Sequence, residues 1–240
     1  MLRVDDVEVR FGGVQALKGV SLEVPDAALV GLIGPNGAGK TTLFNVITGL
    51  EKPSRGRVLM ADQDVTSLPP HQRARRGLGR TFQRIEVFSS LTVHENVLAA
   101  AEARRSWGKD EPEPARSASE LLERVGLRDV EHERVDKLPT GLLRLVEVAR
   151  ALASRPRLLL LDEPGSGLST HESEALGDLL VDLVRDGRSI LLVEHDVELV
   201  MRVCQQIHVL DFGSIIATGT PDEVQRDPAV QAAYLGTSAA

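Results

Sequence analysis

The 240-residue chain has a single cysteine, few aromatic residues and no excess of positive charge. Because Cys204 stands alone, a disulfide within the chain and a cysteine metal cluster are both excluded, and a reducing compartment fits that count. The formal net charge of −7 argues against bulk binding of nucleic acid, which needs a basic surface. We therefore expect no nucleic-acid partner.

Long apolar runs are also missing. No stretch approaches the roughly 20 residues needed to cross a bilayer, and residues 1–6 lead straight into strand-like sequence without an export signal. If the protein serves a membrane process, the spanning part is expected on another chain. Hydrophobic residues make up 42% and charged residues 26%, which is ordinary for a soluble globular protein, and no repeat or low-complexity tract is present.

The strongest positive feature is the segment 34–42, which fits the pattern G-x-x-x-x-G-K-[ST] of a loop that wraps nucleotide phosphates. An apolar strand at 29–33 leads in and helical sequence at 43–47 leads out, as this motif requires. Glycines let backbone N–H groups turn toward phosphates, and the helix N-terminus adds a favourable dipole. The expected phosphate-binding residues are Gly34, Pro35, Asn36, Gly37, Ala38, Gly39, Lys40, Thr41 and Thr42.

Two of these residues have further roles. Lys40 is expected to reach the β- and γ-phosphates, and the Thr41 hydroxyl to ligate Mg²⁺. The motif therefore predicts that the chain binds ATP or GTP.

Two acidic residues, Asp162 and Glu163, end the apolar run 158–161. Such continuous runs are typical of parallel strands, whose carboxyl ends meet at the sheet edge where open α/β sheets bind ligands. We expect Asp162 to hold Mg²⁺, directly or through water, and Glu163 to polarise the attacking water. The alternative is a solvated acidic strand end.

The remaining pattern predicts an α/β core with an inserted helical lobe at 84–154. Strands are expected across 3–33 and at 57–60, 158–161 and 190–193, with a closing hairpin at 207–216 that turns at 211–213. Capping boxes predict helix starts at Thr92, Ser169 and Thr220. An exposed loop is expected at 107–118, followed by a short helix at 119–125.

Three features are weaker indications of function. His195 follows the strand 190–193 and either hydrogen-bonds a γ-phosphate or is polar surface. Gln83, where core meets lobe, offers a carbonyl that could join the Mg²⁺ shell. A basic cluster is expected to form a solvated helix face, with contacts to a partner or to anionic lipid as the alternatives: Arg73, Arg75, Arg76 and Arg80.

In this order the motifs resemble the ATP-binding-cassette (ABC) ATPase family, over nearly the whole chain. The resemblance implies an α/β P-loop NTPase (RecA-like) core with an N-terminal antiparallel β subdomain and an inserted helical subdomain. It implies one ABC ATPase domain, 1–240, in which 1–83 and 155–240 form the nucleotide-binding core with its β subdomain and 84–154 form the helical subdomain.

The resemblance also implies the chemistry of the site. ATP and Mg²⁺ would be the cofactors, with Glu163 and His195 catalytic and with Thr41, Gln83 and Asp162 around the metal. Phe11 stands where the family stacks an aromatic ring, usually Tyr, on adenine; a buried strand residue is the alternative. Glu163 and His195 argue against a nucleotide-binding but inactive subunit.

Within the family, five segments resemble the ATPase of branched-chain (hydrophobic) amino-acid importers: 80–88, 91–97, 193–196, 199–201 and 234–236. This implies a subunit that energises an importer, lies in the cytoplasm on the inner face of the plasma membrane, and works with integral membrane permease subunits. Related ATPases of lipid or lipopolysaccharide exporters share several of these segments. A soluble ABC switch protein is disfavoured, because the chain has one cassette, no heptads and no large insertion.

One departure from the family concerns its Leu-Ser-Gly-Gly-Gln signature, which contacts the ATP of the partner in a head-to-tail pair. Here the position holds Leu138, Pro139, Thr140, Gly141 and Leu142. Proline has neither the serine hydroxyl nor an N–H, and losing one such charge-assisted hydrogen bond costs roughly 1.5–3 kcal/mol. We therefore expect a heterodimer with a second, intact ABC ATPase subunit rather than a homodimer. Ser169 stands where the family commonly has Asp, and either caps a helix or weakens communication between sites.

Overall fold

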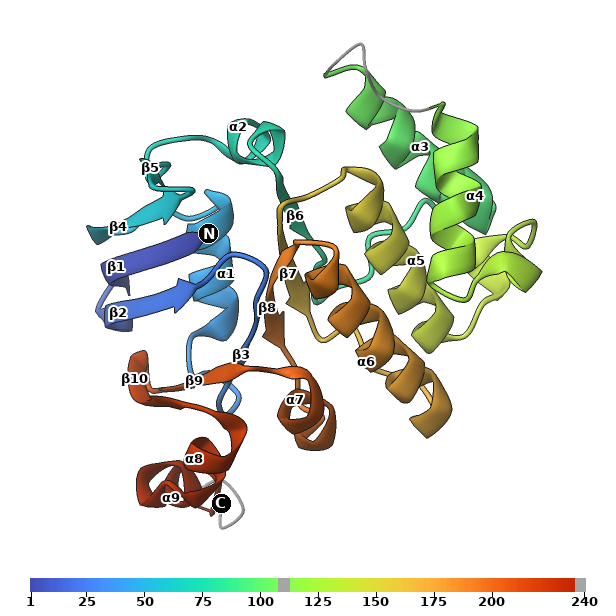
Figure 1. The fold of residues 1–240 in the computed structure, drawn as a ribbon. Helices are drawn as coiled ribbons and strands as arrows, with labels where there is room; N and C mark the ends of the chain where they lie inside the picture. The colour runs from blue at the N-terminus through green and yellow to red at the C-terminus, as the bar shows by residue number, and fades with distance from the viewer. Residues whose placement is uncertain (108–112, 236–240) are drawn as a thin grey trace.

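Two β-sheets form the centre of the molecule in the computed structural model, which describes residues 1–107 and 113–235 (Figure 1). One sheet has the strand order β2-β1-β4-β5 and the other the order β10-β9-β3-β8-β7-β6. The strands are β1 (Leu2–Phe11), β2 (Val14–Val24), β3 (Leu29–Ile33), β4 (Arg55–Met60), β5 (Gln63–Asp64), β6 (Leu78–Arg80), β7 (Leu158–Asp162), β8 (Ser189–Val193), β9 (Gln206–Asp211) and β10 (Ser214–Gly219).

Helices cover both faces of the larger sheet. They are α1 (Lys40–Thr48), α2 (Pro70–Arg75), α3 (Val93–Arg105), α4 (Pro114–Arg124), α5 (Thr140–Ala153), α6 (Thr170–Arg185), α7 (Val197–Val203), α8 (Pro221–Arg226) and α9 (Pro228–Leu235), with 3₁₀ turns η1 (Arg128–Val130) and η2 (Val135–Lys137). No helix in the described parts of the chain is both long and apolar enough to span a bilayer.

The smaller sheet is antiparallel, as the alternating sequence predicts. Val4 and Val7 are both buried although three positions separate them, because the β1 register shifts between them. Asp6, inside this irregularity, has a φ of 50°, and such a bulge inserts the extra residue that returns Val7 to the core face.

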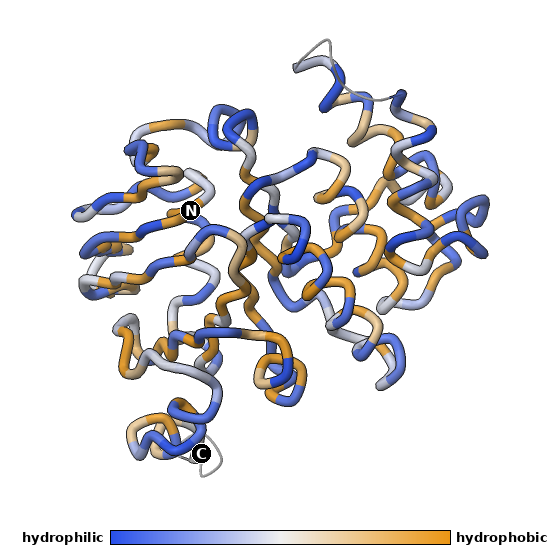
Figure 2. Tube along the Cα trace, viewed as in Figure 1, coloured by the Kyte–Doolittle hydropathy of each residue, from blue (hydrophilic) through white to orange (hydrophobic). Residues whose placement is uncertain are grey.

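The larger sheet separates two apolar cores. In β7, Leu158 and Leu160 face the core shared with α1 and the antiparallel sheet, whereas Leu159 and Leu161 face the core shared with α5 and α6. The neighbouring β3 and β8 pair in parallel and are buried along their whole length. A strand covered on both faces needs an unbroken apolar run, which is the predicted pattern. Figure 2 shows apolar residues concentrated on this sheet and on the helix sides turned toward it.

Helices α3, α4 and α5 pack on one another at the side of the molecule away from the antiparallel sheet (Figure 1). All three predicted capping boxes are confirmed, at Thr92, Ser169 and Thr220. Ser169 therefore caps α6. The predicted hairpin is formed by β9 and β10. The subdomain boundaries given above stay a prediction.

The expected loop at 107–118 is wrong at its C-terminal end. Helix α4 begins at Pro114, five residues before the predicted start at Ser119, because the Glu113 side chain accepts hydrogen bonds from the Ala115 and Arg116 N–H groups. Proline is compatible with the first helical position, where its missing N–H would be unpaired anyway. Residues 108–112 of the expected loop, and Gly236 of the segment 234–236, lie outside the described residues.

The basic cluster is also not the solvated face that was expected. Arg73 is only 1% exposed and donates hydrogen bonds to the carbonyl oxygens of Val46 and Ile47, at the end of α1. The Arg80 side chain is 6% exposed. Arg75 and Arg76 do lie on the surface.

Candidate nucleotide-binding site

Four polar segments follow neighbouring strands of the larger sheet at their carboxyl ends. The phosphate loop, residues 34–42, follows β3; Asp162 and Glu163 end β7; His195 follows β8; and Gln83 follows β6. The order β3-β8-β7-β6 makes these strands adjacent, and the pairs β3–β8, β8–β7 and β7–β6 are parallel. The segments therefore meet at one edge of the sheet.

A cavity of about 380 Å³ lies between these segments. Its lining joins most of the predicted phosphate-binding and metal-binding residues, namely Asn36, Gly37, Ala38, Gly39, Lys40, Thr41, Thr42, Gln83, Asp162 and Glu163. Gly34 and Pro35 stand just before it in the loop. The chain thus brings the glycine-rich turn and the acidic pair into one crevice.

The loop conformation depends on glycine at its start. Gly34 has a φ of 149°, and a Cβ at this position would lie 1.9 Å from the Leu210 carbonyl oxygen. Any side chain would therefore displace the loop from the β9–β10 hairpin. Gly39, with a φ of 112°, precedes the first residue of α1, so the α1 N-terminus opens onto the cavity.

Lys40 is buried at the base of the loop. Its Nζ donates to the carbonyl oxygens of Gly34 at 2.6 Å and Pro35 at 3.0 Å. Desolvation lowers the pKa of Lys40, while the charges of Glu163 and Asp162 act in the opposite direction. The cation stands close enough to both carboxylates for each to raise its pKa.

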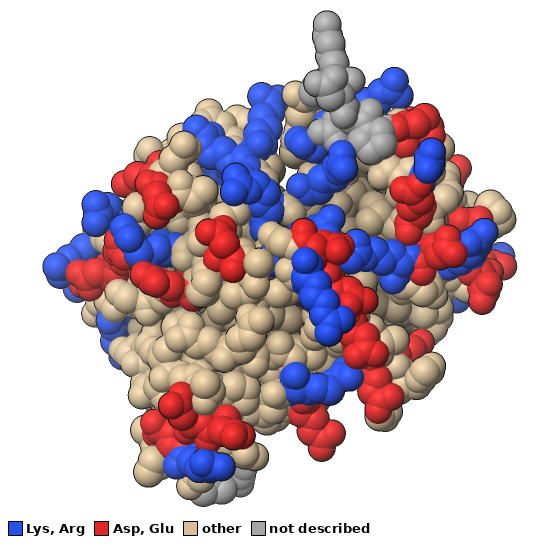
Figure 3. Space-filling view, in the orientation of Figure 1, with Lys and Arg blue, Asp and Glu red and all other residues tan. Residues whose placement is uncertain are grey.

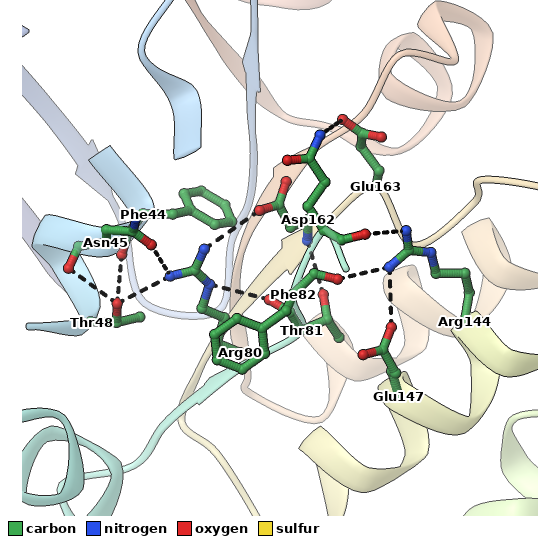
Figure 4. Close-up of polar contacts among 11 residues, drawn as sticks. Phe44, Asn45, Thr48, Arg80, Thr81, Phe82, Arg144, Glu147, Asp162 and Glu163 are labelled. Carbon is green, nitrogen blue, oxygen red and sulfur yellow. Dashed lines mark hydrogen bonds and ion pairs between the residues drawn. The ribbon is translucent and has the colours of Figure 1, made fainter. Parts of the chain in front are cut away.

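Asp162 is almost fully buried beside a second cation. Its Oδ2 forms an ion pair with Arg80 Nη2 at 3.5 Å (Figure 4). This oxygen receives no hydrogen bond. Burial raises the pKa of Asp162, the Arg80 charge opposes that shift, and Glu163 adds to it. A buried carboxylate oxygen that receives no hydrogen bond, on a residue that lines this cavity, suits a metal ion.

The donor set fits magnesium rather than a soft metal. Thr41 offers a hydroxyl, Gln83 an amide carbonyl and Asp162 a carboxylate, all hard oxygen donors. Within residues 1–107 and 113–235, no three His, Cys, Asp or Glu side chains gather as a metal-binding group. The protein alone therefore offers a partial shell, which is how Mg²⁺ is bound when phosphate oxygens supply the rest.

Glu163 lines the cavity and contacts His195, which lies outside the lining. His195 Nε2 is 3.0 Å from Glu163 Oε1, and Gln83 Nε2 is 3.5 Å from the same oxygen. Glu163 has a φ of 52°, an uncommon backbone conformation for a residue with a side chain. Its N–H donates to the Val193 carbonyl oxygen, which fixes this turn against β8. Backbone strain of this kind concentrates at functional sites.

Glu194 is a buried acidic residue whose position the pattern of the sequence does not explain. Its carboxylate accepts hydrogen bonds from the N–H groups of Gly165 and His195. Burial raises the pKa of Glu194, and these backbone donors oppose the shift. The residue thus ties the loop after Glu163 to the backbone of His195.

Besides Gly34, Pro35 and His195, two predicted groups lie outside the cavity lining. Phe11, at the end of β1, is 50% exposed, so its ring is not a core residue. The segment 138–142 begins helix α5, where Pro139 is the N-cap and makes no side-chain capping bond. A Cβ on Gly141 would lie 2.6 Å from the Gly167 carbonyl oxygen, so α5 begins directly against the backbone that follows Glu163.

Charged side chains of both signs lie on the molecular surface. Basic and acidic side chains lie next to one another over much of the face drawn in Figure 3. Opposite charges also pair directly at the surface, as in Arg55 with Asp6 and Arg116 with Glu120.

Besides Glu194, two buried charged residues near the site were given no role by motif reading, namely Arg144 and Glu147. Arg144 and Glu147 stand three residues apart in helix α5, and their side chains are 8% and 5% exposed. The available signal was the placement of charges within the apolar sequence 142–153. A charged pair on a helix that is otherwise apolar must be either solvated on one face or buried with partners.

A strand–loop–helix phosphate-loop motif beside an acidic strand end, in a mostly parallel sheet covered on both faces, defines a P-loop nucleotide-binding fold. The ABC transporter family model matches residues 17–166, and the model "Branched-chain amino acid ATP-binding cassette transporter" matches residues 214–240. The chain belongs to the ABC transporter family, as an ATP-binding cassette ATPase.

Individual relatives agree with this assignment over the full length. The chain is 39% identical to the high-affinity branched-chain amino acid transport ATP-binding protein LivG of Escherichia coli K12, over 98% of each chain. It is 36% identical to the lipopolysaccharide export system ATP-binding protein LptB of Haemophilus influenzae, over 98% of this chain and 97% of LptB. The crystal structure of a nucleotide-free ATP-binding cassette from an ABC transporter superposes with a TM-score of 0.87, at 31% identity and 98% coverage of each chain. The predicted fold class and subfamily resemblance are thus confirmed.

Proposed function

We propose that this ATPase binds MgATP in the cavity between the phosphate loop and the pair Asp162–Glu163. The single observation that carries the proposal is the shared lining, which joins Lys40, Thr41, Asp162 and Glu163 around one space of about 380 Å³. The α1 N-terminus and loop N–H groups would bind the β- and γ-phosphates, with Lys40 reaching them. The exposed ring of Phe11 would stack on adenine.

Magnesium, when bound, would neutralise phosphate charge and would be held by Thr41, Asp162 and Gln83. The protein's own chemistry is proton handling. Glu163 Oε1 would accept a proton from water that attacks the γ-phosphate, a role worth about 10²–10⁴-fold in rate. His195, 3.0 Å from this oxygen, would orient the carboxylate and contact the γ-phosphate.

The transported substrate is proposed to be a branched-chain or another amino acid, taken up by an importer. The match to LivG over the whole chain supports this, together with the match of residues 214–240 to a branched-chain amino acid cassette model. The chain would lie on the cytoplasmic face of the membrane and act on integral permease subunits. The match to LptB supports the second candidate, the ATPase of a lipopolysaccharide-type exporter.

Reconstitution distinguishes these two candidates. The chain, its partner ATPase and their permease subunits in liposomes should take up radiolabelled leucine only with MgATP. A Lys40→Ala chain serves as the inactive control. If the chain instead assembles with a permease that extracts lipopolysaccharide, and no leucine is taken up, the exporter function would replace the importer function as the proposal.

We further propose that the working pair is a heterodimer. Pro139 caps α5 without offering a side-chain or backbone donor, and Leu142 replaces the family's Gln. Two copies of this chain would therefore form two weakened composite sites. A partner with an intact signature would complete the site built on this chain's Lys40, Asp162 and Glu163.

Restoring the signature tests the heterodimer. The change Pro139→Ser with Leu142→Gln should raise the ATPase activity of the chain alone by roughly 10- to 100-fold, the value of one charge-assisted hydrogen bond. Leu50→Gln is a matched control, since Leu50 is 54% exposed and lies outside the cavity lining. Equal activity of the wild-type chain with and without an intact partner would overturn the asymmetric pair.

A further inference from the structure

Helix α5 binds the backbone that follows β6 through a buried polar network. Arg144 Nη1 donates to the Phe82 carbonyl oxygen at 2.7 Å, and Nη2 donates to the Gln83 carbonyl oxygen at 2.5 Å. Glu147 accepts from Arg144 Nη1 at 3.1 Å and from the Glu86 N–H at 2.9 Å. Figure 4 shows Arg144 extending from its helix toward Phe82. Because unpaired buried donors and acceptors are costly, this network favours one arrangement of α5 and residues 82–86.

The core binds the same stretch of chain just before this point. Arg80 Nε donates to the Thr81 carbonyl oxygen at 3.2 Å, and its Nη1 donates to Asn45 Oδ1 in α1 at 2.7 Å. Thr81 Oγ1 accepts from the Asp162 N–H at 2.9 Å. The core therefore fixes the chain as far as Thr81, and α5 fixes it from Phe82 onward. A movement of α5 relative to the core would bend the chain between these two residues.

Gln83 is the residue of this stretch that reaches the cavity. Its side chain lines the cavity and stands 3.5 Å from Glu163 Oε1. Gln83 is exposed, and within the described residues its side chain makes one hydrogen bond, the contact with Glu163. The position of the Gln83 amide is therefore set mainly by its backbone, whose carbonyl oxygen Arg144 holds.

We propose that Arg144 is a positioning residue, which acts on the nucleotide site through Gln83 without touching the cavity itself. Helix α5 also begins with the segment 138–142, so Arg144 makes the cavity-facing amide and the partner-facing segment move as one body. The inference rests on the proposed function, in which Gln83 meets the magnesium and γ-phosphate. Glu147 supports this role by accepting a hydrogen bond from Arg144 Nη1.

A double-mutant cycle tests this role. The variants are Arg144→Met, Gln83→Ala and both together, made in the full chain and assayed with the partner ATPase. One readout is the Mg²⁺ concentration that half-saturates hydrolysis, together with the KM and kcat for MgATP. A second readout is the Mg²⁺ dependence of ATP affinity, measured by equilibrium binding to the chain alone.

If Arg144 acts through Gln83, Arg144→Met raises the Mg²⁺ requirement by a factor on the order of ten, a usual coupling for residues in contact. The double variant then loses no more than Gln83→Ala alone, in both readouts. Losses that multiply in the double variant would mean independent, merely structural roles and would overturn the inference.

Two further variants keep the test decisive. Arg144→Lys retains the charge beside Glu147 but offers a compact ammonium instead of a fork, so it should recover only part of the Mg²⁺ shift. It also replaces Arg144→Met in the cycle if that variant does not fold. Arg116→Met removes an equally sized cation from the exposed surface of α4 and should match wild type.

Different results would overturn the proposed function and the role of Arg144. If the wild-type pair hydrolyses no ATP and the chain shows no Mg²⁺-dependent affinity for it, the nucleotide site itself is overturned. If the wild-type readouts are normal and the cycle shows no coupling, only the role of Arg144 is overturned.

Discussion

The guanidinium of Arg80 lies 3.5 Å from the Asp162 carboxylate, and the two side chains are 6% and 3% exposed. The same guanidinium lies 4.8 Å from the centroid of the Phe82 ring and 5.5 Å from that of Phe44. Desolvation lowers the pKa of Arg80, whereas the charge of Asp162 raises it. Each of these two buried charges therefore depends on the other, and the candidate metal ligand is part of the structural core.

The first prediction concerns this pair. Arg80→Met should lower the free energy of unfolding by about 3–5 kcal/mol, because it leaves Asp162 buried without its counter-charge. Adding Asp162→Asn removes the stranded charge and should recover part of that loss. Urea denaturation of both variants measures this. A double variant that is as unstable as Arg80→Met would show that the ion pair is not the cause.

A second prediction separates two neighbouring arginines of α2. Arg73 donates to the carbonyl oxygens of Val46, Ile47, Leu68 and Thr66, and burial lowers its pKa to about 10, so it stays charged at neutral pH. Arg73→Met should cost at least about 3 kcal/mol of unfolding free energy, since several buried acceptors lose their donor. Arg75→Met, two residues away and exposed, should change stability by less than about 0.5 kcal/mol. Denaturation midpoints that fall equally would contradict the assignment.

A third prediction concerns turnover. Glu163→Gln should keep MgATP affinity within a few fold and lower kcat at least about 100-fold, because the amide cannot accept the proton. Phosphate release and nucleotide binding by the assembled pair report the two effects. Glu120→Gln, an exposed change of the same kind on α4, should leave both unchanged. Wild-type hydrolysis by the Glu163→Gln pair would remove Glu163 from its role.

A fourth prediction concerns pH. His208 is buried, with Nδ1 2.8 Å from Thr218 Oγ1, and burial lowers its pKa below the ordinary value of 6.5. The unfolded chain thus takes up a proton at higher pH than the folded chain. The contribution of His208 to the free energy of unfolding should be fully present above about pH 6.5. It should be lost as the pH drops toward the lower pKa of the folded state, by at most about 1.4 kcal/mol per pH unit.

Histidine variants isolate that contribution. His208→Asn should remove it from the pH dependence of urea denaturation between about pH 7.5 and 5.5. His132→Asn, at a side chain that is 88% exposed, is the control variant. An unchanged slope in His208→Asn would assign the pH dependence to other groups.

The sequence was enough to predict that the glycine-rich loop and the acidic pair meet at one edge of the sheet. Each signal is local, because a glycine spacing or an apolar run that ends in carboxylates occupies fewer than about ten residues. The carboxyl ends of parallel strands lie at the same edge of the sheet, so the fold brings these segments together without any further signal in the sequence. Likewise, Ser169 and Glu172 satisfy one another's backbone groups within a single helical turn, so their capping box is readable directly.

What the tertiary structure alone decided is the burial of charge. Arg73, Arg80 and Arg144 are ordinary basic residues in the sequence. Arg73 binds α1 residues that lie 26 or more positions away in the sequence. Asp162 lies 82 positions from Arg80, and Phe82 lies 62 positions from Arg144. Whether a guanidinium is solvated or buried depends on which carbonyl oxygens and carboxylates the fold places beside it. Pairing with these distant partners leaves no local pattern, so the burial of these charges became visible only once the chain was folded.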